Sequence, residues 1–399
     1  MRQLIKEEKF KKIVSQGFGF EFGIAAEGLY LIEISARARS EKQIGDNETD
    51  DDDLRIEIDS RKFAQPGEPV RYFDGPAAFS GGQLHNLKKT VVFLCQFSEG
   101  KHILAFVPDR EPTLEEIKIY QPQIDGGKIN LELNQQAEDG DRRDWYAFAL
   151  IDLPLKEISI ELTCQKRKWD RDDVKIIIDG QTRRNLKNGI RRFWYWFGAF
   201  FDGKSQSDTF AVNLTKGIHY IEFWADRMPT LNRVMLNFGD ASLKRIPTVY
   251  DPKWTGEFHD DSEKMILARA IFGEAGNQIR DARIAVGWSI KNRLGKDVYP
   301  WRGYKTYNDV VLAPKQYDAF VDPRVRPKLE DLLNEIYNER RAWFECYEIA
   351  ELVFDEKVRD VSEGAVFFHD ISIPQSSFLK ANPNAKYIKQ IDDLLFYGI

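Results

Sequence analysis

Residues 100–114 read GKHILAFVPDREPTL, and residues 217–231 read GIHYIEFWADRMPTL. The shared His, Asp, Arg, Pro, Thr and Leu positions all stand 117 residues apart. A second pair of segments, residues 52–59 and 172–179, matches at an offset of 120 residues, which a small loop insertion explains. Solenoid repeats have periods of only about 20–50 residues. The longer period therefore indicates that a unit of about domain size has been duplicated.

Both copies have the pattern of β structure, because apolar and polar residues alternate in short runs between turn signals. The runs YLIEISAR at residues 30–37 and HYIEF at residues 219–223 have the two-residue period of half-buried strands. A β-sandwich of jelly-roll type is the simplest fold for several such strands. We therefore expect two all-β sandwich modules, at residues 1–126 and 127–245.

The repeated motif, Gly-x-His before an apolar strand and then Pro-Thr-Leu, resembles the closing strands of galactose-binding-like β-sandwich modules. Such modules occur as carbohydrate-binding domains, so the resemblance implies sugar binding. Trp194, Trp196 and Trp224 offer flat faces on which a sugar ring stacks. Core packing is the alternative, and strand alternation would place Trp194 and Trp196 on one face and Tyr195 on the other. Residues 77–80 lack these rings, so the second module is the expected sugar binder.

Composition excludes several classes of partner and site. The net charge of −6 and the pI near 5.6 give no electrostatic reason to expect nucleic acid or an anionic membrane as partner. The three cysteines and five histidines are scattered without ligand spacing, so we expect neither a metal nor a cofactor. The acidic run at residues 46–53 suits calcium in composition, but it lacks the spaced glycine and closing glutamate of an EF-hand. A solvated loop is expected there.

Residues 240–258 have the composition of a linker, after which the apolar period changes from 2 to 3.6 residues. A third domain, residues 246–399, is therefore expected. Helices are predicted at about 261–273, 281–294 and 327–357, with a short strand at about 364–369. This domain is expected to be mainly helical with a small β element.

Glu274 is the main candidate for chemistry in this domain. It follows the apolar helical run that begins behind DDSE at residues 260–263, which fits a capping box. We therefore place Glu274 at or beyond the helix C-terminus. There the helix dipole and the apolar neighbour Phe272 would raise the carboxyl pKa toward the range of a general acid. The alternative is a solvated surface glutamate beside a glycine turn.

Landmarks in the third domain resemble, in the same order, those of the SleB-type cell-wall hydrolases, known from spore-cortex-lytic enzymes. They are ARAIFGEA at 268–275, AVGW to NR at 285–293, VVLAPKQY at 310–317, ECYEIA at 345–350, GAVFFHD at 364–370 and the ending at 391–397. The chain departs from the family at Gly276-Asn277-Gln278, where the family has Arg-Gly-Glu, and at Asp392 and Leu394, where it has Gly and His. These departures affect expected subsite contacts more than Glu274.

The resemblance implies a lysozyme-like α+β catalytic fold. It also implies cleavage of the β-1,4 bond between N-acetylmuramic acid and N-acetylglucosamine in peptidoglycan, most often as a lytic transglycosylase with Glu274 as acid and base. No second acidic residue belongs to the motif, and a transglycosylase needs none, because the muramic 6-hydroxyl attacks within its own sugar. Gln316, Tyr317, His369 and Phe272 are the expected substrate-binding residues; each also has a packing or structural interpretation.

Three alternatives remain at the level of sequence: a hydrolytic muramidase, a non-catalytic wall-binding or structural protein of a phage particle, and N-terminal repeats that bind protein rather than sugar. The expected partners are peptidoglycan glycan strands, and the expected place of action is the bacterial cell wall. No run approaches the roughly 18 apolar residues of a spanning helix. Residues 1–14 lack the continuous apolar region of a signal peptide, so we expect release by lysis, carriage on a phage particle or non-standard export. The sequence leaves oligomeric state open.

Overall fold

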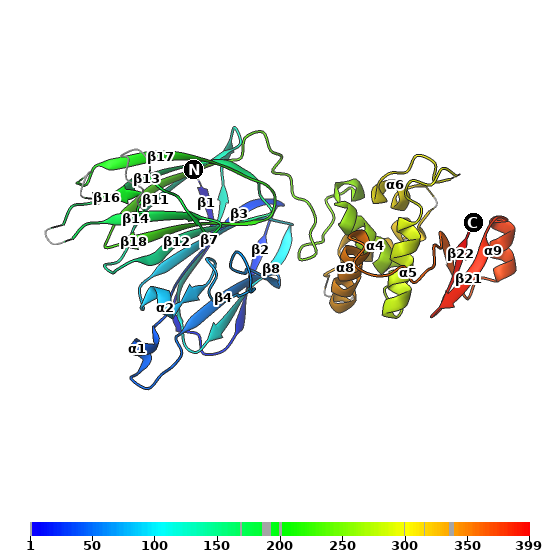
Figure 1. Ribbon diagram of the computed structural model, residues 1–399, viewed down its shortest axis with the longest axis horizontal. Helices are drawn as coiled ribbons and strands as arrows, with labels where there is room; N and C mark the ends of the chain where they lie inside the picture. The colour runs from blue at the N-terminus through cyan, green and yellow to red at the C-terminus, as the bar shows by residue number, and fades with distance from the viewer. Residues whose placement is uncertain are drawn as a thin grey trace. The chain divides into compact units, whose positions relative to one another are not determined.

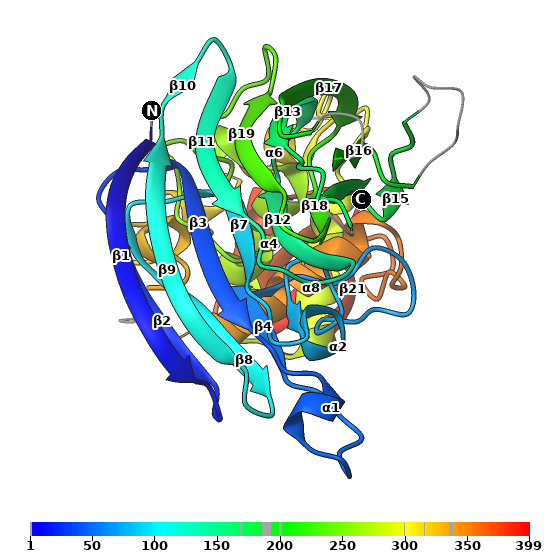
Figure 2. The same cartoon turned by 90° about the vertical axis from the view of Figure 1, so that its left-hand side faces the viewer.

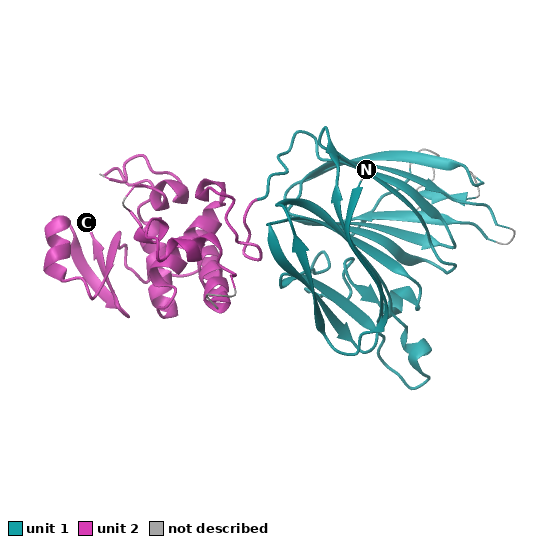
Figure 3. Cartoon of the chain, turned by 180° about the vertical axis from the view of Figure 1, so that it is seen from behind, with its two compact units in different colours: residues 1–245 teal, residues 246–399 magenta. Residues whose placement is uncertain are grey.

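The chain forms two compact units, Met1–Arg245 and Ile246–Ile399 (Figure 3). The computed structural model describes residues 2–167, 170–185, 193–198, 202–298, 300–314, 316–334 and 339–399. Unit 1 consists almost entirely of β-strands, and unit 2 is mainly helical with one small sheet. The predicted fold class, a multidomain chain with β modules before a mainly helical domain, is confirmed.

Unit 1 is built on a nine-stranded sheet with the order β1-β9-β3-β7-β12-β18-β14-β15, in which β16 also pairs with β14 (Figure 2). Its strands are β1 (Arg2–Ile13), β3 (Gly28–Arg37), β7 (Lys89–Phe97), β9 (Thr113–Pro122), β12 (Arg143–Ile151), β14 (Asp173–Ile178), β15 (Gln181–Thr182), β16 (Trp196–Phe197) and β18 (Ile218–Asp226).

Two five-stranded sheets complete unit 1, with the orders β2-β8-β4-β5, where β6 pairs with β4, and β10-β11-β19-β13-β17. Their strands are β2 (Phe18–Ile24), β4 (Asp53–Ile58), β5 (Arg61–Lys62), β6 (Phe79–Ser80), β8 (Gly100–Asp109), β10 (Ile124–Asp125), β11 (Lys128–Gln136), β13 (Leu155–Thr163), β17 (Ser205–Leu214) and β19 (Thr230–Asn237). The short helices α1 (Glu41–Ile44) and α2 (Gly81–Leu84) lie in the connections.

The strand orders of the two predicted modules correspond. In the first, β1-β9-β3-β7 packs on β2-β8-β4-β5 around one apolar core. In the second, β11-β19-β13-β17 packs on β12-β18-β14-β15 around another. Duplication of one sandwich would produce this correspondence. The strands β7 and β12 then pair in parallel, which joins one sheet of each module into the nine-stranded sheet. The two modules therefore form one compact unit rather than separate domains.

Each module contains the same histidine–carboxylate contact. His102 Nδ1 lies 2.7 Å from the Asp59 carboxylate, and His219 Nδ1 lies 2.8 Å from that of Asp179. In both cases the other ring nitrogen, Nε2, lies within hydrogen-bonding distance of the backbone carbonyl four residues earlier in the chain. The repeated histidine of the sequence motif therefore has a structural role.

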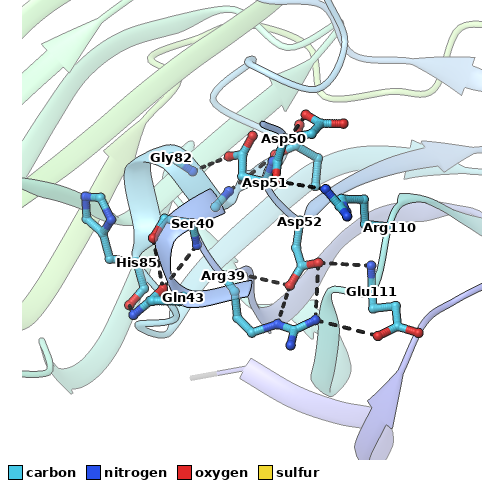
Figure 4. A network of polar contacts seen from close by, with 12 residues as sticks. Arg39, Ser40, Gln43, Asp50, Asp51, Asp52, Gly82, His85, Arg110 and Glu111 are labelled. Carbon is cyan, nitrogen blue, oxygen red and sulfur yellow. Dashed lines mark hydrogen bonds and ion pairs between the residues drawn. The ribbon is translucent and has the colours of Figure 1, made fainter. Parts of the chain in front are cut away.

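The acidic run is only partly the solvated loop that we expected. Asp52 is 1% exposed and accepts a 2.7 Å hydrogen bond from Arg39 Nε (Figure 4). Asp51 accepts a hydrogen bond from a backbone N–H of α2. The second module repeats the first of these contacts, with Arg167 Nε donating to Asp172 at 2.7 Å. These carboxylates anchor loops, a role that composition alone did not reveal.

Unit 2 packs α4, α5 and α8 around a core that includes Trp343 (Figure 1). Its helices are η1 (Phe258–Asp260), α4 (Glu263–Ala275), α5 (Arg280–Lys291), α6 (Tyr307–Val311), η2 (Asp318–Phe320), α7 (Arg326–Glu330), α8 (Arg340–Phe354) and α9 (Gln375–Ala381). A three-stranded sheet follows in the order β20-β22-β21, formed by β20 (Phe367–Asp370), β21 (Lys386–Ile391) and β22 (Leu394–Gly398).

Each predicted helix of this unit overlaps a helix of the structure, but the short helices α6 and α9 and the strands β21 and β22 were not predicted. The expected helix at 327–357 is divided into α7 and α8, and residues 335–338 between them lie outside the described residues. Part of the expected linker belongs to the unit: the N–H of Trp254 donates to the carbonyl of Glu330, and Trp343 Nε1 donates to that of Val249. Gly287 permits the close helix contacts, because a Cβ there would lie 3.0 Å from Ile271.

Candidate functional site

Glu274 lies in the last turn of α4, one residue before the helix ends, and not beyond it. The helix begins where predicted, since the Ser262 side chain accepts a 3.2 Å hydrogen bond from the N–H of Met265. Nearly every side chain from Met265 to Phe272 is buried, so α4 is a core helix that ends at a partly buried carboxylate. A rigid helix therefore fixes the position of Glu274.

A glycine allows η2 to approach this helix end. A Cβ on Gly273 would lie 2.6 Å from the Cβ of Ala319, closer than real contacts allow. The close approach brings the backbone N–H of Ala319 within hydrogen-bonding reach of the Glu274 carboxylate. It also brings Asp318 near enough to act on Glu274 electrostatically. The motif that contains Glu274 thus needs Gly273, because a larger residue there would keep η2 away from the end of α4.

Burial raises the pKa of Glu274 to about 7. The Ala319 N–H lowers this pKa, the Asp318 charge raises it and the Arg293 charge lowers it. Burial is thus the main cause, whereas sequence reasoning had invoked the helix dipole and Phe272. A carboxyl group with this pKa is protonated in a large fraction of molecules near neutral pH, as a general acid must be.

Arg293 links the groups around Glu274. Its Nη1 donates to the Tyr317 hydroxyl at 2.7 Å and to Gln316 Oε1 at 3.3 Å, and its Nε donates to the carbonyl of Val366 at 2.7 Å. Burial raises the pKa of Tyr317 to about 12, while Arg293 lowers it and Glu274 raises it. The structure thus brings Gln316 and Tyr317 together with Arg293 beside Glu274.

Two other predicted residues occupy different surroundings. Phe272 is 6% exposed and packs edge-on against Trp343, with ring centroids 6.2 Å apart, so it belongs to the core. His369 is buried in the small sheet: its Nδ1 donates to the carbonyl of Asp370 at 2.8 Å, and its Nε2 lies 2.9 Å from the Tyr397 hydroxyl. Both rings have structural partners in this arrangement.

Sequence reasoning missed Arg293 and Asp318 as members of this site. Arg293 was interpreted as a helix C-terminal charge, although its Asn-Arg pair was itself one of the family landmarks. Asp318 follows the VVLAPKQY landmark directly, but nothing in the local pattern indicates that it comes near Glu274. That proximity depends on the approach of η2 to α4.

A cavity of about 290 Å³ lies beside this group of residues and shares Tyr317 with it. Aromatic rings of Trp254, Phe258 and Phe320 and the Arg326 side chain contribute to its lining. The segment at 311–314 forms another part of the wall. The cavity meets this group of residues at Tyr317 and provides room for a polar ligand with apolar faces.

The three candidate tryptophans, Trp194, Trp196 and Trp224, do not share one environment. Trp196 is 1% exposed and donates from Nε1 to Asp208 at 2.9 Å, so sugar stacking by Trp196 is excluded in this structure. Tyr195 lies in the same core as Trp196. Strand alternation does not separate the two side chains, because β16 consists only of Trp196 and Phe197 and so includes neither Tyr195 nor Trp194. Trp194 and Trp224 are partly exposed, and both rings lie near Lys175 Nζ.

Neither a metal site nor a spanning helix is found in the described parts of the chain. Within them, no three His, Cys, Asp or Glu side chains are grouped so that they could hold a metal ion. No described helix is long and apolar enough to cross a membrane.

Comparison with known families identifies the type of domain in unit 2. Residues 277–397, just under a third of the chain, match the family described as Cell Wall Hydrolase. The chain therefore carries a cell wall hydrolase domain after its β-rich region. Glu274 lies immediately upstream of the first matched residue, so the match itself does not assign its role. No curated protein matches the chain.

Solved structures are similar only at a low level. Dimeric latent PorU from Porphyromonas gingivalis has 10% identity and a TM-score of 0.22, over 59% of this chain and 20% of that chain. An isomalto-dextranase of Arthrobacter globiformis T6 has 9% identity and a TM-score of 0.20, over 58% and 36%. The tandem CBM22 domains of Xyn10C from Paenibacillus barcinonensis have 10% identity and a TM-score of 0.16, over 60% and 98%. The chain thus spans about a fifth of the length of PorU and about a third of that of the isomalto-dextranase. TM-scores this low do not assign a fold to the chain.

Proposed function

We propose that this cell wall hydrolase domain is a lytic transglycosylase that cleaves the β-1,4 bond between N-acetylmuramic acid and N-acetylglucosamine in peptidoglycan. The observation that carries the proposal is Glu274, a partly buried carboxyl group held at the end of a rigid helix with a pKa of about 7. It is the group best suited to donate and then accept a proton near neutral pH.

In the proposed reaction, protonated Glu274 gives its proton to the glycosidic oxygen as the bond from that oxygen to muramic C1 breaks. The N-acetylglucosamine end leaves as a neutral alcohol. The muramic 6-hydroxyl oxygen then bonds to C1, and its proton passes to the Glu274 carboxylate. The product is a 1,6-anhydro sugar, and Glu274 returns to its protonated state. Holding both steps within one sugar replaces a bimolecular attack by an intramolecular one.

The residues around Glu274 support this assignment. The Ala319 N–H stabilises the carboxylate formed between the two proton transfers, since it is a hydrogen-bond donor fixed on η2. Gln316 and Tyr317, oriented by Arg293, are proposed to position the glycan through the amide and the hydroxyl. His369 is proposed to act indirectly, by holding Tyr397 and the small sheet in place.

A hydrolytic muramidase is the second candidate, and Asp318 favours it. This exposed carboxylate raises the pKa of Glu274 and therefore lies near enough to be considered as a water-activating base. An Asp318→Asn variant separates the two reactions. A transglycosylase should retain its product and most of its rate, whereas a hydrolase that uses Asp318 as base should lose nearly all activity.

Product analysis tests the proposal directly. Purified sacculi are digested with the full-length protein, and the soluble fragments are analysed by mass spectrometry. Anhydro-muropeptides are expected; reducing ends would instead establish hydrolysis. Glu274→Gln should lower release by about 100- to 10,000-fold, while Glu348→Gln, at an exposed glutamate on α8, serves as the matched control. Sacculi that bind the protein without release of any fragment would support a non-catalytic wall-binding or phage-particle role.

Unit 1 is proposed to hold the enzyme on its polymer, which raises the effective concentration of substrate at unit 2. Partial exposure of Trp194 and Trp224 keeps these two rings as candidate sugar contacts. Action at the bacterial cell wall follows from the proposed substrate. The route to the wall, by lysis, by a phage particle or by another export system, belongs to the same proposal.

A further inference from the structure

The outer face of the sheet β10-β11-β19-β13-β17 contains a groove of about 590 Å³. Side chains from all five strands of the sheet, β10, β11, β19, β13 and β17, line it. They include Asn130, Ser159, Glu161, Thr209, Arg233 and Met235. None of these residues belongs to the apolar core of the second module; each stands beside a core residue on its strand, or, for Thr209, beside Phe210, which packs against the core.

The floor of the groove is a row of side chains in fixed register. Asn130 lies opposite Met235, Met235 opposite Ser159, and Ser159 opposite Thr209. The hydroxyl oxygens of Ser159 and Thr209 are 2.8 Å apart. Cross-strand neighbours in a sheet keep their spacing, so this row presents an amide, a thioether and two hydroxyl groups as one rigid surface.

The first module has the same face but a different chemistry. Glu33 pairs there with Val92 and Lys118, as Ser159 pairs with Thr209 and Met235 in the second module. Val92 is fully buried, and with its neighbours Leu31 and Leu94 it belongs to the core of the second module, which covers this face. The equivalent position in the second module holds a polar residue on an open groove.

The charges of the groove are balanced. Arg233 Nη2 donates to Glu161 at 2.6 Å, and the lining also contains one further acid, Asp125, and one further base, Lys128. A surface with paired charges has no net attraction for a phosphate backbone. Hydroxyl and amide groups beside an apolar thioether suit instead a neutral ligand that carries hydroxyl and acetamido groups.

We propose that this groove binds the N-acetylated glycan strand of peptidoglycan. The inference rests on the proposed substrate of Glu274 and adds a second contact with the same polymer. Met235 would contact the acetamido methyl or the C–H face of a sugar, and the row of polar side chains would bind its hydroxyl and amide groups. The groove lies on the opposite side of the module from Trp224, because the two outer faces belong to the two sheets that enclose the core.

The test uses the full-length Glu274→Gln protein, so that the polymer is not consumed, and purified sacculi as the probe, because their muramic carboxyl groups are amide-linked and the polymer sediments. Ser159→Trp fills the middle of the groove and should weaken co-sedimentation by about tenfold or more, since it excludes the ligand sterically. Ser15→Trp, at an exposed bend of the first module, is the matched control and should bind as the parent does. Circular dichroism checks the fold of each variant.

Should Ser159→Trp not fold, the double change Asn130→Ala with Thr209→Val removes polar groups without adding bulk and should weaken binding several-fold. Unchanged binding in a folded groove variant overturns the proposal. Binding lost in Trp224→Ala but kept in the groove variants would overturn it in favour of the aromatic face. Failure of the proposed function has a different signature: the wild-type chain would release no fragment from sacculi, whatever the groove variants bind.

Discussion

Glu274 in unit 2 and Glu222 in unit 1 have the same raised pKa but different surroundings. Burial raises both values to about 7. Glu274 lies in the last turn of a helix, beside a fixed backbone N–H and a hydrogen-bonded Arg–Tyr–Gln group whose Tyr317 also lines a cavity. Glu222 lies within a sheet, where Trp224 Nε1 donates to it at 3.0 Å. A raised pKa therefore marks burial, and only the surroundings distinguish a proposed acid from a structural carboxyl group.

Glu222 has a clear structural cause for its shift. The Asp144 charge raises its pKa further, while Lys89 and Lys175 lower it. Asp144 and Lys89 are each 1% exposed and lie 2.5 Å apart. Because Lys89 lies on β7 and the acids on β12 and β18, these charges sit where the two modules join.

The largest predicted difference between the two glutamates is catalytic. Glu274→Gln should lower the rate of fragment release by about 100- to 10,000-fold, the usual contribution of general acid–base catalysis. Glu222→Gln should leave it within about twofold, since the change does not touch unit 2 chemistry. Dye release from labelled sacculi measures both rates. Comparable losses in the two variants would remove the distinction.

The buried pair at the module junction predicts the next effect. Lys89→Met leaves Asp144 without its counter-charge, and losing one partner of a buried pair costs about 3–5 kcal/mol. The free energy of unfolding of unit 1, measured in urea, should fall by this amount. Lys89→Met combined with Asp144→Leu should recover much of it. A single variant as stable as wild type would show that the pair is not buried as described.

Stability should also depend on pH through Glu222. Its pKa is raised from the ordinary 4.5 to about 7, so the folded state binds this proton more tightly than the unfolded state. The resulting stability is present below about pH 4.5 and is lost as pH rises through about 7, a change of about 3 kcal/mol. Urea titrations at pH 5 and 8 measure it. In Glu222→Gln, this part of the pH dependence should disappear.

The smallest effect concerns the support of Glu274. Gly273→Ala puts a methyl group against Ala319 and should displace η2, at a cost of about 1–3 kcal/mol in stability. Activity should also fall, because the Ala319 N–H that lowers the pKa of Glu274 would be displaced. Adding Ala319→Gly removes the clash and should restore both properties. A double variant no better than Gly273→Ala would show that the contact does not position the acid.

The fold was predictable wherever local pattern was sufficient. Alternation along strands such as β4 and β18 and the capped apolar run of α4 predicted the two fold types and the change between them. The joined sheet was not predictable, because the parallel β7–β12 pairing depends on contacts between segments more than fifty residues apart. Trp196 was misplaced for a related reason: alternation needs a strand longer than the two residues of β16.

The sequence motifs predicted several residues of the candidate site, but they did not predict the contacts between those residues. Ordered motifs singled out Glu274, Gln316 and Tyr317. In the structure Arg293 donates hydrogen bonds to Gln316 and Tyr317, and its charge acts on Glu274. The nearness of Asp318 and of the Ala319 N–H follows from helix packing through Gly273, which no local pattern encodes. Phe272 was assigned to the site because of its sequence neighbour, yet its side chain faces the core.

The parallel pairing of β7 with β12 has a consequence for how unit 1 can be divided or stretched. A cut after residue 126 would uncover the apolar side chains of Leu31, Val92 and Leu94 and leave β7 as an open edge, a combination that promotes aggregation. We therefore expect the two modules to melt in a single cooperative transition. If unit 1 binds the wall as we propose, tension on it would pass through the one continuous sheet that joins its two sandwiches.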